Sequence, residues 1–197
     1  MVERKKVFRY CPSCGEDVFT YSVSVRERVE IRCSSCGLPL EVGIKGKSKP
    51  LDCIIIADDD KSFRSGVAEL LIKRGISLNV ISCESGSEFL SQITERLRNG
   101  LPVSLAILDV LMPYLDGVAT AKALRAVERG FQLQIPIPIL FLFPIRTDES
   151  LQKAIIRCKP AFFLSKGPKP NPDQMVERIE KVVSYFLKEL YKEGGTE

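Results

Sequence analysis

The hydrophobic pattern of the chain changes near residue 50. Between residues 19 and 32, apolar side chains alternate with polar or charged ones, which is the period of a β-strand with one exposed face. Charged residues interrupt the alternation at Arg26–Arg28, so the segment predicts a hairpin that turns there. The next stretch, Gly43–Pro50, contains two glycines and three lysines but one aliphatic residue, a composition typical of linkers. The first fifty residues therefore predict a small β unit followed by a linker.

From residue 51 onward, apolar runs alternate with amphipathic stretches. The runs predict strands over 51–57, 78–81, 103–108, 137–143 and 161–164. The amphipathic stretches predict helices over 62–74, 87–99, 117–129, 149–157 and 173–192. Gly75, Gly100 and Gly130 follow three of these helices, where glycine readily forms a left-handed C-terminal cap. Near-continuous apolar strands separated by helices predict an α/β fold, a doubly wound five-stranded parallel sheet covered on both faces.

The charge distribution supports a division into two units. Residues 1–50 contain 10 Lys and Arg against 6 Asp and Glu, which accounts for the whole net charge of +4. The remaining residues contain 19 of each kind, so their net charge is zero. We expect a β unit over 1–42, a linker over 43–50, an α/β domain over 51–193 and a short tail over 194–197.

Composition removes several classes of protein. The 197 residues include no His, which excludes Ser-His-Asp triads and His-ligated metal sites. No apolar run reaches the roughly 18 residues of a membrane helix, and residues 1–30 lack the apolar block of a signal peptide. Seven Cys without an export signal favour free thiols in a reducing compartment. We therefore expect a cytoplasmic protein that does not insert into a membrane.

Four of the cysteines form a metal-ligand pattern. Two Cys-x-x-Cys-Gly strings flank the predicted hairpin, and they contain Cys11, Cys14, Cys33 and Cys36. The hairpin would bring the two turns together, and four thiolates suit tetrahedral Zn²⁺, so the segment resembles a zinc ribbon. Since four thiolates leave no open coordination position, we expect structural zinc that supplies folding energy to a small unit.

Acidic residues follow two of the predicted strands. Asp58, Asp59 and Asp60 come after the first strand, and Asp109 ends the third. In a sheet of order 2-1-3-4-5 these two strands are neighbours at the switch point, where ligands bind. Clustered carboxylates without His or Cys suit Mg²⁺, and Lys166 after the fifth strand would point into the same crevice. Acids, Mg²⁺ and a lysine together indicate phosphoryl chemistry.

These residues, with the string Leu108-Asp109-Val-Leu-Met-Pro113-Tyr-Leu-Asp116-Gly117 and Phe163-Leu-Ser-Lys166, resemble the receiver domain of two-component response regulators. The resemblance covers about residues 51–193 and implies a flavodoxin-like fold. It implies that Asp109 accepts a phosphoryl group and that Asp58, Asp59 and the carbonyl of Leu111 complete a Mg²⁺ site. It further implies that Lys166 contacts the phosphoryl group and that the donor is a histidine kinase or phosphotransfer protein.

The chain departs from the receiver pattern at two places. Receivers carry Ser or Thr at the end of the fourth strand, where this chain has Phe143, or Phe141 if the alignment starts from Pro136. Gly167 stands where a proline commonly follows the lysine. A phenylalanine cannot donate a hydrogen bond to a phosphoryl oxygen, and such a bond to a charged group contributes about 1.5–3 kcal/mol. We therefore expect phosphorylation to be weakly coupled to conformation.

Other polar residues have simpler interpretations. Asp60 and Asp116 are expected to cap helices. Cys53, Cys83 and Cys158 are expected to be small core residues.

The favoured function is a signalling protein, not an enzyme, whose receiver regulates protein–protein contacts through the ribbon or through homodimerisation. One alternative is DNA binding through the ribbon and Lys45, Lys47 and Lys49. It is disfavoured because four thiolates and one Zn²⁺ would lower the charge of the first unit from +4 to about +2. A second alternative is a degenerate receiver that acts as a scaffold independently of phosphorylation.

An enzymatic alternative is a phosphatase of the haloacid-dehalogenase type, which the Asp58-Asp59-Asp60 string would also fit. That family needs an acidic pair after its lysine, and none lies near Lys166.

Overall fold

The computed structural model describes residues 8–25, 28–40, 50–144, 149–167 and 170–193. The chain divides into two compact units, one of residues 1–48 with 178–197 and one of residues 49–177. The predicted linker, apart from Pro50, and the predicted tail over 194–197 lie outside the described residues. Within the described ranges, no helix combines the length and the apolar character that crossing a bilayer requires.

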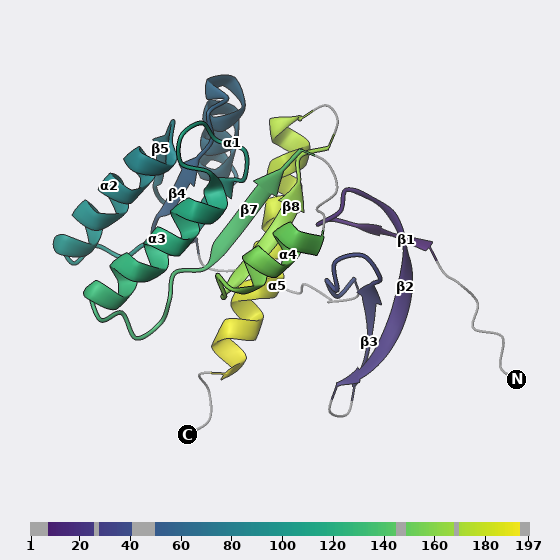
Figure 1. Ribbon diagram of the computed structural model, residues 1–197. Coiled ribbons are helices and arrows are strands. Elements are labelled where there is room, and N and C mark those ends of the chain that lie inside the picture. Colours follow the sequence, from purple (N-terminus) through teal and green to yellow (C-terminus); the bar gives the residue numbers. More distant parts are fainter. Residues whose placement is uncertain (1–7, 26–27, 41–49, 145–148, 168–169, 194–197) are drawn as a thin grey trace, which may run out of the picture. The chain divides into compact units, whose positions relative to one another are not determined.

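The amino-terminal unit contains an antiparallel sheet of order β1-β2-β3 (Figure 1). Its strands are β1 (Phe8–Cys11), β2 (Glu16–Val25) and β3 (Arg28–Cys33). The hairpin of β2 and β3 was predicted from the period of two, and its turn falls between Val25 and Arg28. Strand β1 was not predicted, because four residues are too few to show a period. It forms through pairing with β2, where Phe8 lies opposite Phe19 and Cys11 opposite Glu16.

The second unit contains the predicted parallel sheet (Figure 1). Its strands are β4 (Ile54–Ala57), β5 (Val80–Cys83), β6 (Leu105–Asp109), β7 (Ile139–Phe143) and β8 (Ala161–Ser165). Its helices are α1 (Lys61–Lys73), α2 (Gly86–Arg98), α3 (Gly117–Gly130) and α4 (Glu149–Ile156), and α5 (Pro172–Glu193) begins in this unit and continues into residues assigned to the first. The order β5-β4-β6-β7-β8 is the predicted 2-1-3-4-5 order. The second strand begins two residues later than expected, at Val80.

Alternating strand residues fill the two faces of this sheet, because successive side chains of a strand point to opposite sides. Ile55, Ala57, Leu108 and Phe141 belong to a buried cluster that also contains side chains of α2, α3 and α4. Figure 1 shows these three helices along one face of the sheet. The intervening residues, such as Ile107, are equally buried on the other face. Burial on both faces explains why the strands read as continuous apolar runs. The predicted core cysteines Cys53, Cys83 and Cys158 are all buried.

One of the three glycine caps was predicted wrongly. Gly75 and Gly100 have φ of 68° and 66°, in the left-handed region, as expected. Gly130, in contrast, belongs to α3, which continues to the cap residue Phe131. The left-handed residue after this helix is Gln132, with φ of 56°. The left-handed residue therefore comes two positions after Gly130, at Gln132. Gly130 itself is tolerated in the last turn of the helix.

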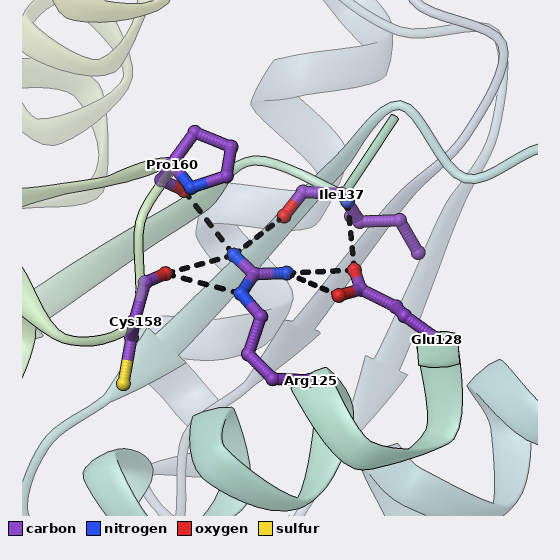
Figure 2. Close-up of polar contacts among 5 residues, drawn as sticks. All are labelled: Arg125, Glu128, Ile137, Cys158 and Pro160. Carbon is purple, nitrogen blue, oxygen red and sulfur yellow. Dashed lines mark hydrogen bonds and ion pairs between the residues drawn. The ribbon is translucent and has the colours of Figure 1, made fainter. Parts of the chain in front are cut away.

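A largely buried arginine, with 11% of its side chain exposed, connects α3 to the amino ends of β7 and β8 (Figure 2). The Nη1 of Arg125 donates to both carboxylate oxygens of Glu128, at 2.6 and 2.7 Å. Its Nε and Nη2 donate to the Cys158 carbonyl at 3.1 and 2.9 Å, and Nη2 also reaches the carbonyls of Ile137 and Pro160. Glu128 in turn accepts a hydrogen bond of 2.7 Å from the Ile137 amide. The pair therefore fixes the ends of two strands opposite the edge where Asp109 lies.

We expect Arg125→Met to destabilise the second unit by about 3–5 kcal/mol, because the buried Glu128 carboxylate loses its guanidinium. The double variant Arg125→Met/Glu128→Leu removes both charges and is expected to be more stable than Arg125→Met alone. Arg129→Met, at an exposed position on the same helix, is the control. Urea unfolding followed by helical circular dichroism measures the differences. A loss below about 1 kcal/mol for Arg125→Met would contradict a role in stability.

Candidate functional site

Two carboxylates meet where two neighbouring strands of the parallel sheet end. Asp58 directly follows β4, and Asp109 is the last residue of β6. The strands are paired in parallel, with Ala57 opposite Leu108, so the next residue of each lies at the same edge. Both acidic residues are buried, with exposed fractions of 0% for Asp58 and 4% for Asp109. The sheet register thus holds two acidic groups together out of contact with bulk water.

Lys166 bridges the two carboxylates. It follows β8, and its amide donates to the Phe143 carbonyl at the end of β7. Its Nζ lies 2.7 Å from the Asp58 Oδ2 and 3.0 Å from the Asp109 Oδ2. The side chain is 10% exposed. The structure therefore brings Asp58, Asp109 and Lys166 together, and this convergence was predicted from the sequence.

The other predicted site residues lie at the rim. Asp59 is exposed, but its carboxylate lies in one group with those of Asp58 and Asp109, whose ligand atoms are within 4.8 Å of one another. Asp60 caps α1, since its Oδ1 accepts the Phe63 amide at 3.0 Å, as predicted. Leu111 lies in the loop after β6 and is exposed. The role of its carbonyl as a metal ligand stays a prediction.

Local geometry explains why Asp116 and Gly117 occupy the start of α3. Asp116 caps α3 by accepting the Ala119 amide at 2.7 Å, as predicted. A Cβ on Gly117 would lie 2.2 Å from the backbone carbonyl oxygen of Asp109. Only glycine permits this close approach of α3 to the end of β6. The capping residue and the glycine together hold the loop that surrounds Asp109.

Burial governs the ionisation of the site. Loss of water raises the pKa of Asp109 to about 6, an effect that Lys166 opposes and the Asp58 carboxylate reinforces. Burial also raises the pKa of Asp58, against the effect of Lys166. Burial alone would lower the pKa of Lys166, but hydrogen bonds and charge interactions with the two carboxylates raise it instead. At neutral pH the Asp109 carboxylate is therefore largely ionised.

The carboxylates fit a small hard cation. Asp109 Oδ1 is buried and has no hydrogen-bond partner within the described ranges of the chain. An acceptor of this kind is costly to bury unless a ligand satisfies it. Three carboxylates at one edge, without nitrogen or sulfur donors, are the donor set that Mg²⁺ prefers. Asp58, Asp59 and Asp109 would hold the ion.

The amino-terminal unit contains a second group of possible ligands. The sulfur atoms of Cys11, Cys14, Cys33 and Cys36 all lie within 4.8 Å of one another. Cys11 Sγ is 3.5 Å from Cys36 Sγ, and Cys14 Sγ is 3.7 Å from Cys33 Sγ. Tetrahedral zinc with Zn–S bonds of about 2.3 Å places its sulfurs roughly 3.8 Å apart. The cysteine cluster therefore has nearly the size that Zn²⁺ requires.

The turns that contain these cysteines direct backbone amides at sulfur. The amides of Cys14 and Cys36 each lie 3.4 Å from the sulfur three residues earlier. Gly15 and Gly37 follow with φ of 77° and 74°, in the left-handed region that glycine adopts readily. A hydrogen bond from Cys14 is the first of several contacts that lower the pKa of Cys11. The same kind of sulfur contact raises the pKa of Cys14 and Cys36, whereas the two backbone amides favour the thiolate, which is the zinc-binding form.

Phe143 occupies the last position of β7. It lies opposite Ser165, the residue before Lys166, and Asp109 lies opposite Leu142. Of the two possible alignments, this register places Phe143 and not Phe141 at the carboxyl edge. Phe143 is 4% exposed, and its ring centroid lies 5.7 Å from that of Phe163. The position therefore contributes an aromatic contact in place of a hydroxyl group.

Two residues of α1 contact the site and were not predicted to do so. The Arg64 guanidinium donates to the backbone carbonyl of Asp58. Lys166 Nζ lies 4.9 Å from the centre of the Phe63 ring. The sequence showed Phe63 only as one of several apolar residues on a helix face. The side chain that it contacts is distant in sequence, so periodicity gave no signal of this contact.

Comparison with known families matches residues 54–180 to the response regulator receiver domain. The transcriptional regulatory protein ZraR of Salmonella typhimurium is 31% identical over 133 residues, which are 67% of this chain and 26% of that protein. Histidine kinase 1 of Arabidopsis thaliana is 38% identical over 66 residues, which are 32% of this chain and 6% of that protein. The chain thus covers about a quarter or less of the length of these two relatives.

Solved structures show the same fold. The receiver domain of the histidine kinase CKI1 from Arabidopsis thaliana, in complex with Mg²⁺ and BeF₃⁻, is similar with a TM-score of 0.55 and 26% identity. The match covers 68% of this chain and 90% of that one. The chemotaxis protein CheY4 of Vibrio cholerae has a TM-score of 0.51 at 24% identity, over 67% of this chain and 98% of that one. The second likeness concerns the fold alone.

We expect Asp109→Asn to stabilise the second unit at pH 7 without added divalent cation, by about 2 kcal/mol. The raised pKa means that the folded state binds the proton more tightly than the unfolded state. The stabilising effect of that proton is complete below the ordinary pKa of 3.8 and is lost as the pH rises through about 6. The difference between variant and wild type should therefore shrink from pH 7 to pH 4.

Urea unfolding at several pH values measures this difference. Asp52→Asn, at an exposed position, should change stability by less than about 0.5 kcal/mol. An Asp109→Asn protein less stable than the wild type at pH 7 would contradict the argument.

Proposed function

We propose that this chain, which belongs to the response regulator receiver domain family, accepts a phosphoryl group on Asp109 and acts through protein–protein contacts. The observation that carries the proposal is the convergence of Asp58, Asp109 and Lys166 at the carboxyl edge of the sheet. A pKa of about 6 leaves the Asp109 carboxylate largely ionised at neutral pH, as a nucleophile must be. The proposed role is that of a signalling protein and not of an enzyme that turns over a substrate.

In the proposed transfer, a carboxylate oxygen of Asp109 forms a bond to phosphorus. The bond between that phosphorus and a histidine nitrogen of a kinase or phosphotransfer protein breaks, and the imidazole remains with the donor. Bound Mg²⁺ would neutralise phosphoryl charge, and Asp58, Asp59, Asp109 and the Leu111 carbonyl would hold it. Lys166, already between the carboxylates, would contact a phosphoryl oxygen. The exposed side chains of Leu111 and Tyr114, in the segment between β6 and α3, would offer apolar contacts to a docking donor.

We further propose that the four cysteines bind structural Zn²⁺ and that the ribbon provides the surface for a protein partner. Four exposed aromatic side chains lie on one face of its sheet: Phe8, Tyr10, Phe19 and Tyr21. The centroids of Phe8 and Phe19 are 4.1 Å apart. Exposed aromatic clusters are typical of protein interfaces. A reducing, cytoplasmic location is proposed because both metal ligation and the buried thiols require reduced cysteine.

DNA binding and homodimerisation are the alternatives for the ribbon. Residues 8–25 and 28–40 contain three basic residues, Arg9, Arg28 and Arg32, and three acidic ones, Glu16, Asp17 and Glu30. Arg32 is already paired with Glu30 at 2.7 Å. Residues 1–50 as a whole have a net charge of +4, which four thiolates and one Zn²⁺ would lower to about +2, so the attraction to a phosphate backbone is small. The aromatic face is therefore more suited to a protein.

The expected response to phosphorylation is local because Phe143 donates no hydrogen bond. Moving a switch from 1:99 to 99:1 takes about 5.5 kcal/mol, and the missing bond is worth about a third to a half of that. With Mg²⁺ and beryllofluoride, we expect NMR shifts in the wild type to remain near Asp109. Phe143→Thr should extend them along β7 and β8.

Phe143→Val is the matched control, because valine has the shape of threonine without its hydroxyl group. Extensive shifts in the wild type, or equal effects of the two substitutions, would contradict weak coupling through the missing hydroxyl.

For the ribbon, we expect the immobilised 197-residue chain to capture a protein partner that the Phe19→Ser variant does not capture. Val29→Ser, on the opposite face of the same sheet, should retain it. Removal of zinc should abolish capture, because the metal holds the unit together. Light scattering of the purified protein tests for a homodimer.

Binding of random duplex DNA that weakens steeply with salt would instead favour the DNA-binding alternative.

A further inference from the structure

The Lys166 ammonium has a third neighbour besides its two carboxylates. Its Nζ lies 4.9 Å from the centre of the Phe63 ring, within the range of a cation–π interaction. Phe63 is 4% exposed and belongs to the first turn of α1. The ring therefore covers one side of the ammonium group of a lysine whose side chain is 10% exposed. Removal from water strengthens this kind of attraction.

The ring is held in place by the same cap that begins α1. The Phe63 amide donates to the Asp60 Oδ1 at 3.0 Å. The Asp60 amide in turn donates to the Asp58 Oδ1, also at 3.0 Å. Lys166 contacts both Asp58 and the Phe63 ring, so the four residues form a closed set of contacts. The position of the ring is thus tied through two hydrogen bonds to a carboxylate of the site.

We propose that Phe63 is a positioning residue that holds the Lys166 ammonium between Asp58 and Asp109. Its effect on ligands rests on the proposed function of the site. An aliphatic residue of similar size would fill the same volume but would offer no negative ring face to the ammonium. Lys166 would then be held by the carboxylates alone and would move more freely.

If Phe63 positions Lys166, its replacement should change the affinities for Mg²⁺ and for a phosphoryl analogue in opposite directions. Without metal, Lys166 occupies carboxylate oxygens that Mg²⁺ needs, so loosening the lysine favours Mg²⁺. With a phosphoryl analogue bound, Lys166 contacts the analogue, so loosening the lysine weakens that ligand. General damage to α1 would instead weaken both ligands. The opposite signs therefore distinguish positioning from a purely structural role.

The test uses Phe63→Leu in the whole 197-residue chain, and calorimetry measures the binding of Mg²⁺ and then of BeF₃⁻ in saturating Mg²⁺. We expect Mg²⁺ to bind about threefold to tenfold more tightly and BeF₃⁻ to bind less tightly by a similar factor. Phe63→Tyr retains the ring and should restore both affinities. Val67→Ala, at a fully buried position one turn along α1, controls for lost packing and should not produce opposite changes.

A double-mutant cycle tests the contact without any ligand. Phe63→Leu, Lys166→Met and the double variant should show a coupling of about threefold to tenfold in the unfolding equilibrium constant. A coupling below about twofold, or affinities for Mg²⁺ and BeF₃⁻ that fall together as in Val67→Ala, would overturn the proposal. If the coupling is present but the wild type binds neither ligand, the positioning role stands and the phosphoacceptor function fails.

Discussion

The ionic contact of Lys166 with Asp58 and Asp109 is the interaction on which the functional end of this molecule depends. Parallel pairing of β4 with β6 forces the two carboxylates together, and burial on both faces of the sheet keeps water from them. Two buried negative charges would repel each other strongly at this separation. The lysine at the end of β8 offsets that repulsion. Among the residues that the structure describes, one Asp109 oxygen has no hydrogen-bond partner, and a cation would satisfy it.

The remaining features of the site follow from keeping that contact in place. The cap at Asp60 and the Phe63 ring hold the α1 side of the site. On the other side, Gly117 permits α3 to approach the backbone of Asp109 closely. Arg125 fixes β7 and β8 at their opposite ends, away from the carboxylates. Arg125 therefore stabilises the amino ends of two strands, and the charged residues lie at the carboxyl edge of the sheet, where a ligand would bind.

Phe143 is expected to affect the conformational response to phosphorylation but not the binding of ligands at the carboxylates. The carboxylates and the lysine do not need a hydroxyl group at that position in order to bind a cation or accept a phosphoryl group. A conformational switch does need additional contacts to the new ligand, and Phe143 instead packs against Phe163. The predicted weak response follows from a residue that fills space and donates nothing. An output through the ribbon would then depend on contacts with partners at least as much as on the receiver.

Much of this architecture could be predicted from the sequence because it depends on local pattern. The strands, their order and the caps at Asp60 and Asp116 follow from apolar runs, helical periodicity and hydrogen-bonding chemistry. Contacts between residues far apart in the chain could not be read in this way, as Phe63 and Arg125 show. The error at Gly130 has the opposite cause, because a glycine allows a helix to end without requiring it. The zinc proposal rests on ligand chemistry, and the short distances among the four cysteine sulfurs support it.

The most direct test of the central claim is the intact mass of the protein after incubation with acetyl phosphate and Mg²⁺. Because the chain contains no His, a labile phosphoryl group would point to a carboxylate. We predict one added phosphoryl group, absent without Mg²⁺ and absent in Asp109→Asn. The absence of any adduct in the wild type, or an adduct that persists in Asp109→Asn, would contradict the assignment of Asp109 as phosphoacceptor.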